Sequence, residues 1–297
     1  AGITGQTAEP VGGTIVRDDQ GNPTGVLLNR AVPLLDQAVP RPTAARLADQ
    51  IARALDSMAA LGYVAVHEAG SDSAQLAAFE LLERQGRLPI RVYDMLSARD
   101  TGLARRWAAR GPRRDSTRML RVRAVKAYYD GALGSRGARL LADYTDSTGH
   151  RGVSGAGYGF DRALVAELMR AGFQLAIHAI GDAGNREVLE FVEEVYRAAP
   201  TTRRNRHRIE HAQVVHPADF ARFRTDSLVA SMEPPHAVED MPWAEARLGP
   251  ERVGGAYAWR TMRRHGVPLI LNSDLPGSAF DFFYGFHSAV NRQDRTG

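Results

Sequence analysis

The chain has 297 residues, of which 44% are hydrophobic, so it can bury a substantial core as one large α/β domain or as two smaller ones. It contains no cysteine, which excludes disulfides, thiolate nucleophiles and cysteine-type zinc sites. The net charge of +4 comes from scattered arginines without interleaved aromatic residues, so nucleic acid is not an expected partner.

The first 41 residues are rich in glycine and proline, and they predict turns and a small hairpin at most. Apolar residues then recur at helical spacing from 47 to 58, after a start signal at Thr43 and before Gly62. We therefore expect a Gly/Pro-rich insertion segment at 1–41 and a catalytic domain at 42–297.

Runs of β-forming residues alternate with helical or polar stretches over the rest of the chain. Predicted strands lie at 63–67, 89–95, 122–128, 173–178, 206–211, 227–232 and 268–273, and predicted helices at 73–85, 101–110, 161–172, 183–198, 216–224 and 251–265. Asp182 is the predicted N-cap of the helix at 183–198. Strict alternation implies a parallel sheet, and seven units fit a (β/α)₈ barrel with one strand missing better than an open doubly wound sheet.

Lys126 is the only lysine, since every other residue among the 38 lysines and arginines is arginine. Arginine stays protonated in proteins, whereas a buried lysine can lose its proton and act as a nucleophile or base. Its amine can also take up carbon dioxide to form a carbamate, which is a metal-binding carboxylate. Position 126 is therefore predicted to need chemistry that arginine cannot perform.

Four ionisable residues, Lys126, His178, His211 and Asp274, lie at or near the carboxyl ends of predicted strands. In a (β/α)₈ barrel these ends meet at one face, so we expect the four side chains to converge on one cavity. Two imidazoles, a carboxylate and a carbamate form a donor set suited to zinc, iron or manganese. An ion held there would activate water and polarise a carbonyl or phosphoryl oxygen.

Three segments around these residues carry a family resemblance: Val-Lys-Ala-Tyr-Tyr-Asp-Gly-Ala-Leu-Gly-Ser-Arg (125–136), Ile-His-Ala-Ile-Gly-Asp (177–182) and Arg-Ile-Glu-His-Ala-Gln (208–213). They resemble the amidohydrolase superfamily, in particular the amidohydrolase family 3 branch that includes N-substituted formamide deformylases. The resemblance extends over nearly the whole chain. Segments 231–236 and 272–276 match more loosely, and Glu233 stands where the branch often has glutamine.

The resemblance implies a TIM-like (β/α)₈ metal-dependent hydrolase barrel, here with seven of eight strands. It implies that Lys126 is a carboxylated bridging ligand and that His178 and His211 hold the second metal. Asp274 would bind the first metal and act as the general base. One or two divalent ions, zinc foremost, are the implied cofactor.

Six further residues near predicted strand ends or in loops have secondary expected roles. Asp130, Glu210 and His236 could contact substrate or orient ligands, with structural hydrogen bonding as the alternative. Trp243, Trp259 and Tyr257 could line a pocket or pack in the core.

The chain departs from the resemblance at one motif, because the first strand of that family ends in His-x-His and no such motif is present here. We therefore expect an incomplete first metal site, a chain that begins downstream of the first strand, and no terminal β-sandwich. The truncated chain alone would then have weak activity or none.

The leading functional hypothesis is hydrolysis of amide-type C–N bonds by metal-activated water. Two alternatives stay open: a lyase or aldolase that forms a Schiff base through Lys126, and a non-catalytic truncated relative. We expect a small-molecule substrate, a cytoplasmic location, and neither nucleic acid nor membrane as a partner; a homodimer is compatible with the sequence. Specificity lies in loops whose shape the sequence does not give, so the substrate stays open.

Overall fold

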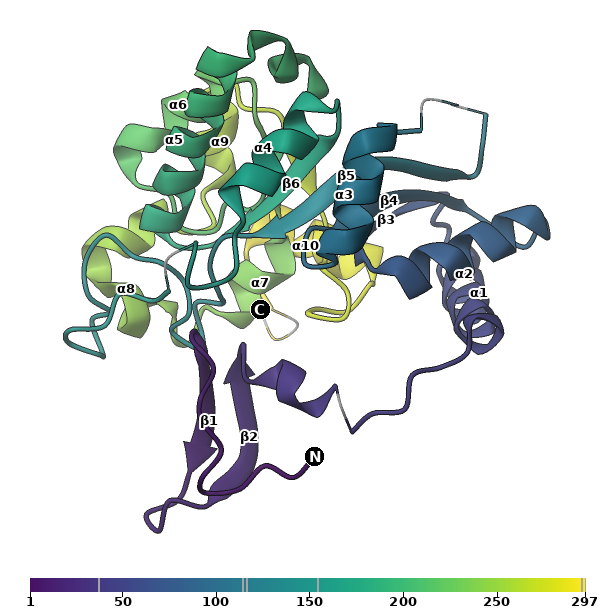
Figure 1. Cartoon of the computed structure of the whole chain (residues 1–297). Coiled ribbons are helices and arrows are strands. Elements are labelled where there is room, and N and C mark those ends of the chain that lie inside the picture. Colours follow the sequence, from purple (N-terminus) through teal and green to yellow (C-terminus); the bar gives the residue numbers. More distant parts are fainter. Residues whose placement is uncertain (37, 114, 116, 154, 295, 297) are drawn as a thin grey trace. The chain divides into compact units, whose positions relative to one another are not determined.

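The computed structural model describes residues 1–36, 38–113, 115, 117–153, 155–294 and 296 (Figure 1). They form two compact units. The first unit combines Ala1–Leu35, Tyr128–Phe160 and Ile177–Gly297, and the second combines Asp36–Ala127 and Asp161–Ala176. The expected division at residue 41 stays a prediction.

The strands form two sheets. They are β1 (Gly13–Arg17), β2 (Pro23–Asn29), β3 (Ala65–Ser71), β4 (Arg91–Ser97), β5 (Leu120–Tyr128), β6 (Gln174–Ala179), β7 (Arg208–His211), β8 (Val229–Met232) and β9 (Leu269–Leu271). β1 and β2 form an antiparallel hairpin, whereas β3 to β9 form one sheet in chain order. The pairs with a described register in the larger sheet, β3–β4, β4–β5, β7–β8 and β8–β9, are all parallel. The predicted α/β fold with seven parallel strands is confirmed.

Helices follow most of these strands. They are α1 (Ala44–Ala60), α2 (Ser73–Arg84), α3 (Thr101–Arg110), α4 (Arg162–Arg170), α5 (Asp182–Ala198), α6 (Phe220–Thr225), α7 (Pro234–Glu239), α8 (Ala244–Arg252), α9 (Trp259–Arg264) and α10 (Phe282–Asn291), with short 3-10 helices η1 (Val32–Leu35), η2 (Pro200–Asn205), η3 (Pro217–Asp219) and η4 (Val253–Gly255). Within the described ranges, none of these helices combines the length and hydropathy that a membrane crossing needs.

Two predicted helix details are wrong. The expected helix at 251–265 is broken, because the 3-10 helix η4 (Val253–Gly255) separates the end of α8 from the start of α9. The N-cap of α5 is Gly181 rather than Asp182. Asp182 is the first helical residue, and its Oδ1 accepts hydrogen bonds from the backbone N–H groups of Ala183 and Leu141, so it ties a loop to the helix start.

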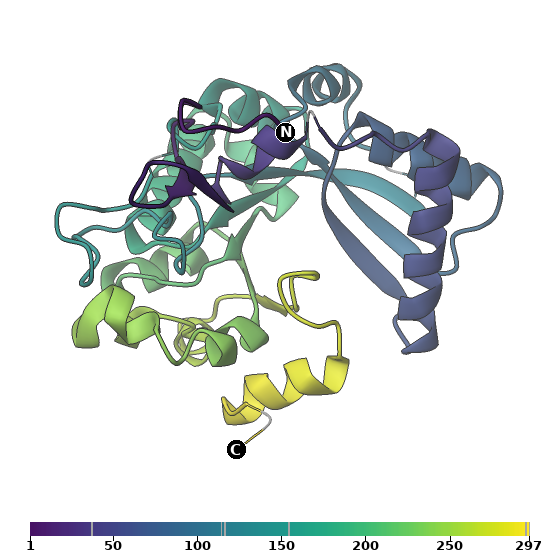
Figure 2. The ribbon, with the colours of Figure 1, turned by 90° about the horizontal axis from the view of Figure 1, so that it is seen from below.

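In the second unit, α1 runs along the strands β3 to β5 (Figure 2). The helix starts where the sequence predicts, since the Thr43 hydroxyl accepts a hydrogen bond from the Arg46 backbone N–H. Its buried face carries Ala48, Ala52 and Leu55 at helical spacing. Burial of this apolar stripe therefore fixes α1 in place.

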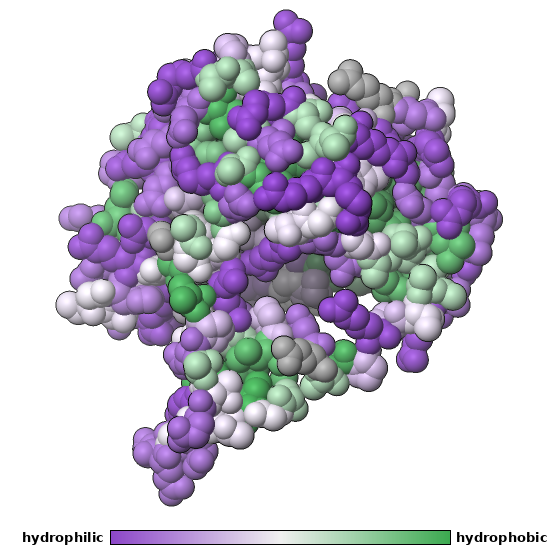
Figure 3. Space-filling view, in the orientation of Figure 1, coloured by the Kyte–Doolittle hydropathy of each residue, from purple (hydrophilic) through white to green (hydrophobic). Residues whose placement is uncertain are grey.

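In the first unit, the expected hairpin at the start of the chain is present as β1 and β2. Its turn is the polar sequence 18–22, and the tip is hydrophilic in Figure 3. The Asp18 side chain accepts hydrogen bonds from the backbone N–H groups of Gln20 and Asn22, which closes the turn.

His207, directly before β7, makes the stability of the fold depend on pH. Its side chain is fully buried, and burial lowers the pKa of His207 from 6.5 to about 4. The unfolded chain therefore takes up this proton at higher pH than the folded chain, so the stabilisation is complete above pH 6.5 and is lost as pH falls towards 4. The test measures the free energy of unfolding of the parent and of His207→Phe by urea unfolding at pH 8 and at pH 5. From pH 8 to pH 5 the parent should lose about 2 kcal/mol more than the variant loses. Parallel pH profiles of the two proteins would contradict this.

Candidate metal site

Asp130, two residues beyond β5, is completely buried and holds the start of α5. Its carboxylate accepts hydrogen bonds from the backbone N–H groups of Arg139, Ile180 and Gly181, each at 2.9 Å. Asp130 Oδ1 also lies 3.6 Å from Nε2 of His178 on β6. The structure thus brings two of the predicted site residues, Asp130 and His178, together.

Glycines near the start of α5 allow this close approach. A Cβ at Gly184 would lie 2.5 Å from Asp130 Oδ2, and one at Gly181 would lie 1.9 Å from the Arg139 carbonyl oxygen. Burial raises the pKa of Asp130 to about 7, whereas the three donated hydrogen bonds lower it. All three backbone partners are donors, so they match the ionised carboxylate, which only accepts.

His211, the last residue of β7, lies beside His178, with ring centroids 4.3 Å apart. Its backbone has a φ of 73°, and Ala212 follows at 41°. A left-handed backbone is costly for residues other than glycine, and such strain concentrates at functional sites. The predicted pair of strand-end histidines is therefore adjacent, and its backbone is strained.

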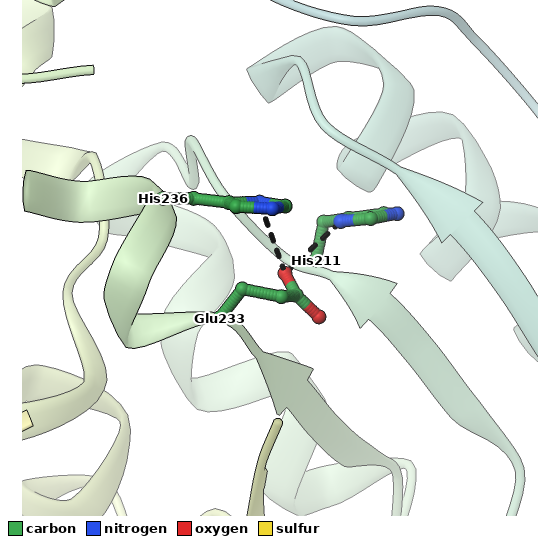
Figure 4. Close-up of side chains that lie close together, drawn as sticks. All are labelled: His211, Glu233 and His236. Atoms are coloured by element: carbon green, nitrogen blue, oxygen red, sulfur yellow. Dashed lines mark hydrogen bonds and ion pairs between the residues drawn. The ribbon is translucent and has the colours of Figure 1, made fainter. Parts of the chain in front are cut away.

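His211, Glu233 and His236 form a compact cluster (Figure 4). His211 Nδ1 is 3.0 Å and His236 Nδ1 is 3.9 Å from Glu233 Oε2. Glu233 follows β8 directly, and Pro234 then starts α7, which carries His236. Glu233 is 5% exposed, so its charge is well shielded from water.

This cluster fits a divalent cation by its chemistry. One ligand atom from each of the three residues lies within 4.8 Å of the others. Zinc bonds of about 2 Å to nitrogen and oxygen place ligand atoms up to about 4 Å apart, so a small adjustment suffices. His211 also adjoins His178, so a fourth possible ligand, a ring nitrogen of His178, lies beside the cluster.

Asp274 lies in the turn after β9, next to the cluster. Its backbone N–H donates to Asn272 Oδ1 at 2.9 Å, and Asn272 Nδ2 donates to Glu233 Oε1 at 2.9 Å. A Cβ at Gly277 would lie 3.3 Å from His236 Nε2 and 3.7 Å from Asp274 Oδ2, so these two polar atoms flank the glycine. Asp274 is exposed, and its predicted role as a metal ligand and general base stays a prediction.

Glu210 is tied to a neighbouring arginine. Arg208 donates to both of its carboxylate oxygens, at 2.6 and 2.8 Å, and both side chains are buried. The two residues are separated by one position in β7, so they share a face of the strand. Arg208 thus holds Glu210, whose predicted contact with substrate stays a prediction.

Lys126 lies on β5 in the second unit and is 4% exposed. Its backbone carbonyl accepts a hydrogen bond from the Ala98 N–H at 2.9 Å. Burial of the only lysine supports the view that it is not an ordinary surface cation. Its predicted role as a carboxylated ligand stays a prediction.

A narrow recess lies beside the cluster. It is lined by His211, Gln213, Met232, Glu233, His236, Tyr257 and Trp259. The Tyr257 hydroxyl donates to Asp240 at 2.5 Å and accepts from Gln213 Nε2 at 3.0 Å. Burial raises the pKa of both Tyr257 and Asp240. Tyr257 and Trp259 both line this recess and are both buried in the core, so the two expected roles coincide.

Glu233 and Asn272 are the site residues that the sequence prediction omits. Glu233 directly follows the predicted strand 227–232 and Asn272 lies near the end of the predicted strand 268–273, so the same strand-end rule could have selected them.

Comparisons with known proteins identify the family of this chain. The model of the amidohydrolase family matches residues 1–297. The protein YtcJ of Bacillus subtilis (strain 168) is 29% identical over 302 residues, which is 99% of this chain and 55% of YtcJ. LONG AFTER FAR-RED 3 of Arabidopsis thaliana is 29% identical over 98% of this chain and 52% of that protein. The chain spans about half the length of these curated relatives.

A solved structure supports the fold class. The uncharacterized metal-dependent hydrolase from Pyrococcus furiosus is 26% identical to this chain, with a TM-score of 0.77. The match covers 93% of this chain and 54% of the chain of that protein. The protein of the same description from Pyrococcus horikoshii OT3 gives a TM-score of 0.76 at 26% identity, over 88% of this chain and 51% of its own. The predicted TIM-like fold of metal-dependent hydrolases is confirmed.

Proposed function

Because this chain belongs to the amidohydrolase family, we propose that it hydrolyses amide-type C–N bonds of a small molecule, with N-substituted amides or formamides as the substrate class. The observation that carries the proposal is the adjacency of four side chains: His178, His211, Glu233 and His236. Asp274 lies beside them in an exposed turn. Within this group, His178 and His211 can hold a divalent ion next to a carboxylate that can move protons.

Each residue has a defined part in the proposed reaction. His178 and His211 would hold the ion, for which zinc suits the nitrogen donors. When bound, such an ion lowers the pKa of water and polarises the carbonyl of the substrate. Asp274 takes the proton from the attacking water and passes it to the leaving amine, so one carboxylate serves both steps.

The direct test measures amide hydrolysis by the zinc-loaded full-length protein on N-substituted formamides and acetamides, with and without a chelator. We expect cleavage that the chelator abolishes and that zinc restores. His211→Ala should weaken zinc binding by about 100-fold or more, because it removes a ligand, whereas His287→Ala on α10 removes an imidazole elsewhere and serves as the control. Hydrolysis that persists unchanged without metal would refute the proposal.

The carbamate proposed for Lys126 has a test of its own, because the chain offers only one lysine. In ¹³C-bicarbonate, the zinc-loaded parent should show a carbamate carbon signal by NMR that is absent from the spectrum of Lys126→Arg. Arginine keeps its proton and cannot form this adduct. Trapping of the parent by borohydride with a carbonyl compound would instead support a Schiff-base lysine.

A further inference from the structure

A chain of hydrogen bonds connects His211 to the turn that carries Asp274. It runs from His211 Nδ1 to Glu233 Oε2 (3.0 Å), from Glu233 Oε1 to Asn272 Nδ2 (2.9 Å) and from Asn272 Oδ1 to the Asp274 N–H (2.9 Å). Its members come from the ends of β7, β8 and β9. Three consecutive strands are thus linked through one carboxylate and one amide.

The orientation of the Asn272 amide follows from its neighbours. The backbone N–H of Asp274 can only donate, so the atom that it meets is the amide oxygen. The NH₂ group then faces Glu233 Oε1 and the Ser231 hydroxyl oxygen, at 2.9 and 3.1 Å. Glu233 Oε1 therefore accepts a hydrogen bond whose direction is fixed.

The tautomer of His211 follows in turn. An ionised carboxylate only accepts hydrogen bonds, so Nδ1 of His211 carries the proton that points at Glu233 Oε2. The ring lone pair then lies on Nε2. Figure 4 shows this second nitrogen at the far end of the ring from Glu233. A carboxylate behind an imidazole in this way fixes the ring and increases its strength as a ligand.

We propose that Glu233 is a positioning residue, which fixes the tautomer of His211 so that Nε2 binds the ion, and that Asn272 couples this carboxylate to the Asp274 turn. The proposal rests on the proposed function and deepens it. It assigns Glu233 and His236 places beside the ion rather than among its ligands, although their atoms are close enough to hold one.

The first experiment reads the tautomer in the metal-free chain by long-range ¹H–¹⁵N NMR. The parent should show His211 protonated at Nδ1. In Glu233→Gln, the side-chain carbonyl of the glutamine must face the Asn272 NH₂ group, which donates to it. The NH₂ group of the glutamine then donates to Nδ1 of His211, so the ring proton moves to Nε2. The same His211 tautomer in both proteins would overturn the proposal, whatever the catalytic activity.

The second experiment measures the affinity of the full chain for Zn²⁺ alone by calorimetry. Glu233→Gln and Asn272→Asp should each weaken binding by about 10- to 100-fold, the range for residues that orient a ligand. His236→Asn should keep the parent affinity. Asn22→Asp is the matched control, since it also removes an amide beside a carboxylate, that of Asp18 in the hairpin turn.

The outcomes separate the two roles of the cluster. If Glu233 and His236 bind the ion directly, His236→Asn should lose zinc affinity to the same extent as His211→Ala. Asn272→Asp should then have little effect on zinc affinity. This pair of results would show that the positioning role of Glu233 is wrong. A parent chain that binds no zinc contradicts the proposed function and, with it, the metal-binding part of this inference. The tautomer measurement still decides what Glu233 does to His211. Thermal unfolding of each variant shows that it is folded.

Discussion

Asp274→Asn is expected to lower kcat for amide hydrolysis by about 10²- to 10⁴-fold, the usual contribution of a general base. Asparagine keeps the backbone N–H that donates to Asn272, so the turn after β9 should persist. It cannot take a proton from water or pass one to the leaving amine. The measurement is steady-state hydrolysis of an N-substituted formamide by the zinc-loaded protein, together with its zinc content.

The matched control for this variant is Asp281→Asn at the start of α10. Asp281 Oδ1 accepts from the N–H groups of Phe283 and Tyr284, and asparagine serves equally well as an N-cap. We expect the control to keep the parent kcat. Retained turnover in Asp274→Asn would remove this residue from the proton-transfer step.

Asp130→Asn should have the largest effect on stability, lowering the free energy of unfolding by about 2–3 kcal/mol. Both carboxylate oxygens accept from buried backbone N–H groups, those of Ile180 on one oxygen and of Arg139 and Gly181 on the other. An amide has only one oxygen, so its NH₂ must face at least one of these donors. Urea unfolding at pH 8 measures the loss.

Asp72→Asn supplies the comparison for this experiment. Asp72 accepts from the N–H groups of Ala74 and Gln75 through a single oxygen, which asparagine reproduces. We expect it to change the unfolding free energy by no more than about 0.5 kcal/mol. An equally small effect of Asp130→Asn would mean that its three donors find other acceptors.

The sequence predicts the sheet well because hydrophobic periodicity is a local signal. Each of the seven predicted strands overlaps an observed one, and α1 begins after its Thr43 cap. The helix at 251–265 fails because the prediction weighed apolar spacing and overlooked Gly254 and Gly255, which disfavour a helix interior and lie in the 3-10 helix η4. The prediction also omits the short α7, since a helix of six residues carries little periodicity.

The site is predicted in part, and its limits have a physical cause. The strand-end rule finds His178 and His211, whose neighbouring strands bring their rings together. Glu233 contacts His211 from 22 residues away, and that contact depends on how the backbone turns at His211 and where α7 starts. Asn272 likewise acts through a hydrogen bond between two loops. Such contacts follow from three-dimensional geometry, which spacing alone does not give.

Because of its left-handed backbone, Ala212 is a residue at which a higher melting temperature and a higher catalytic rate require different side chains. A glycine there would relieve a cost of about 1–2 kcal/mol and should raise the melting temperature. It would also loosen the peptide that aims the neighbouring imidazole of His211. Selection of this protein for survival at high temperature should therefore favour Ala212→Gly, and selection for rate should restore alanine.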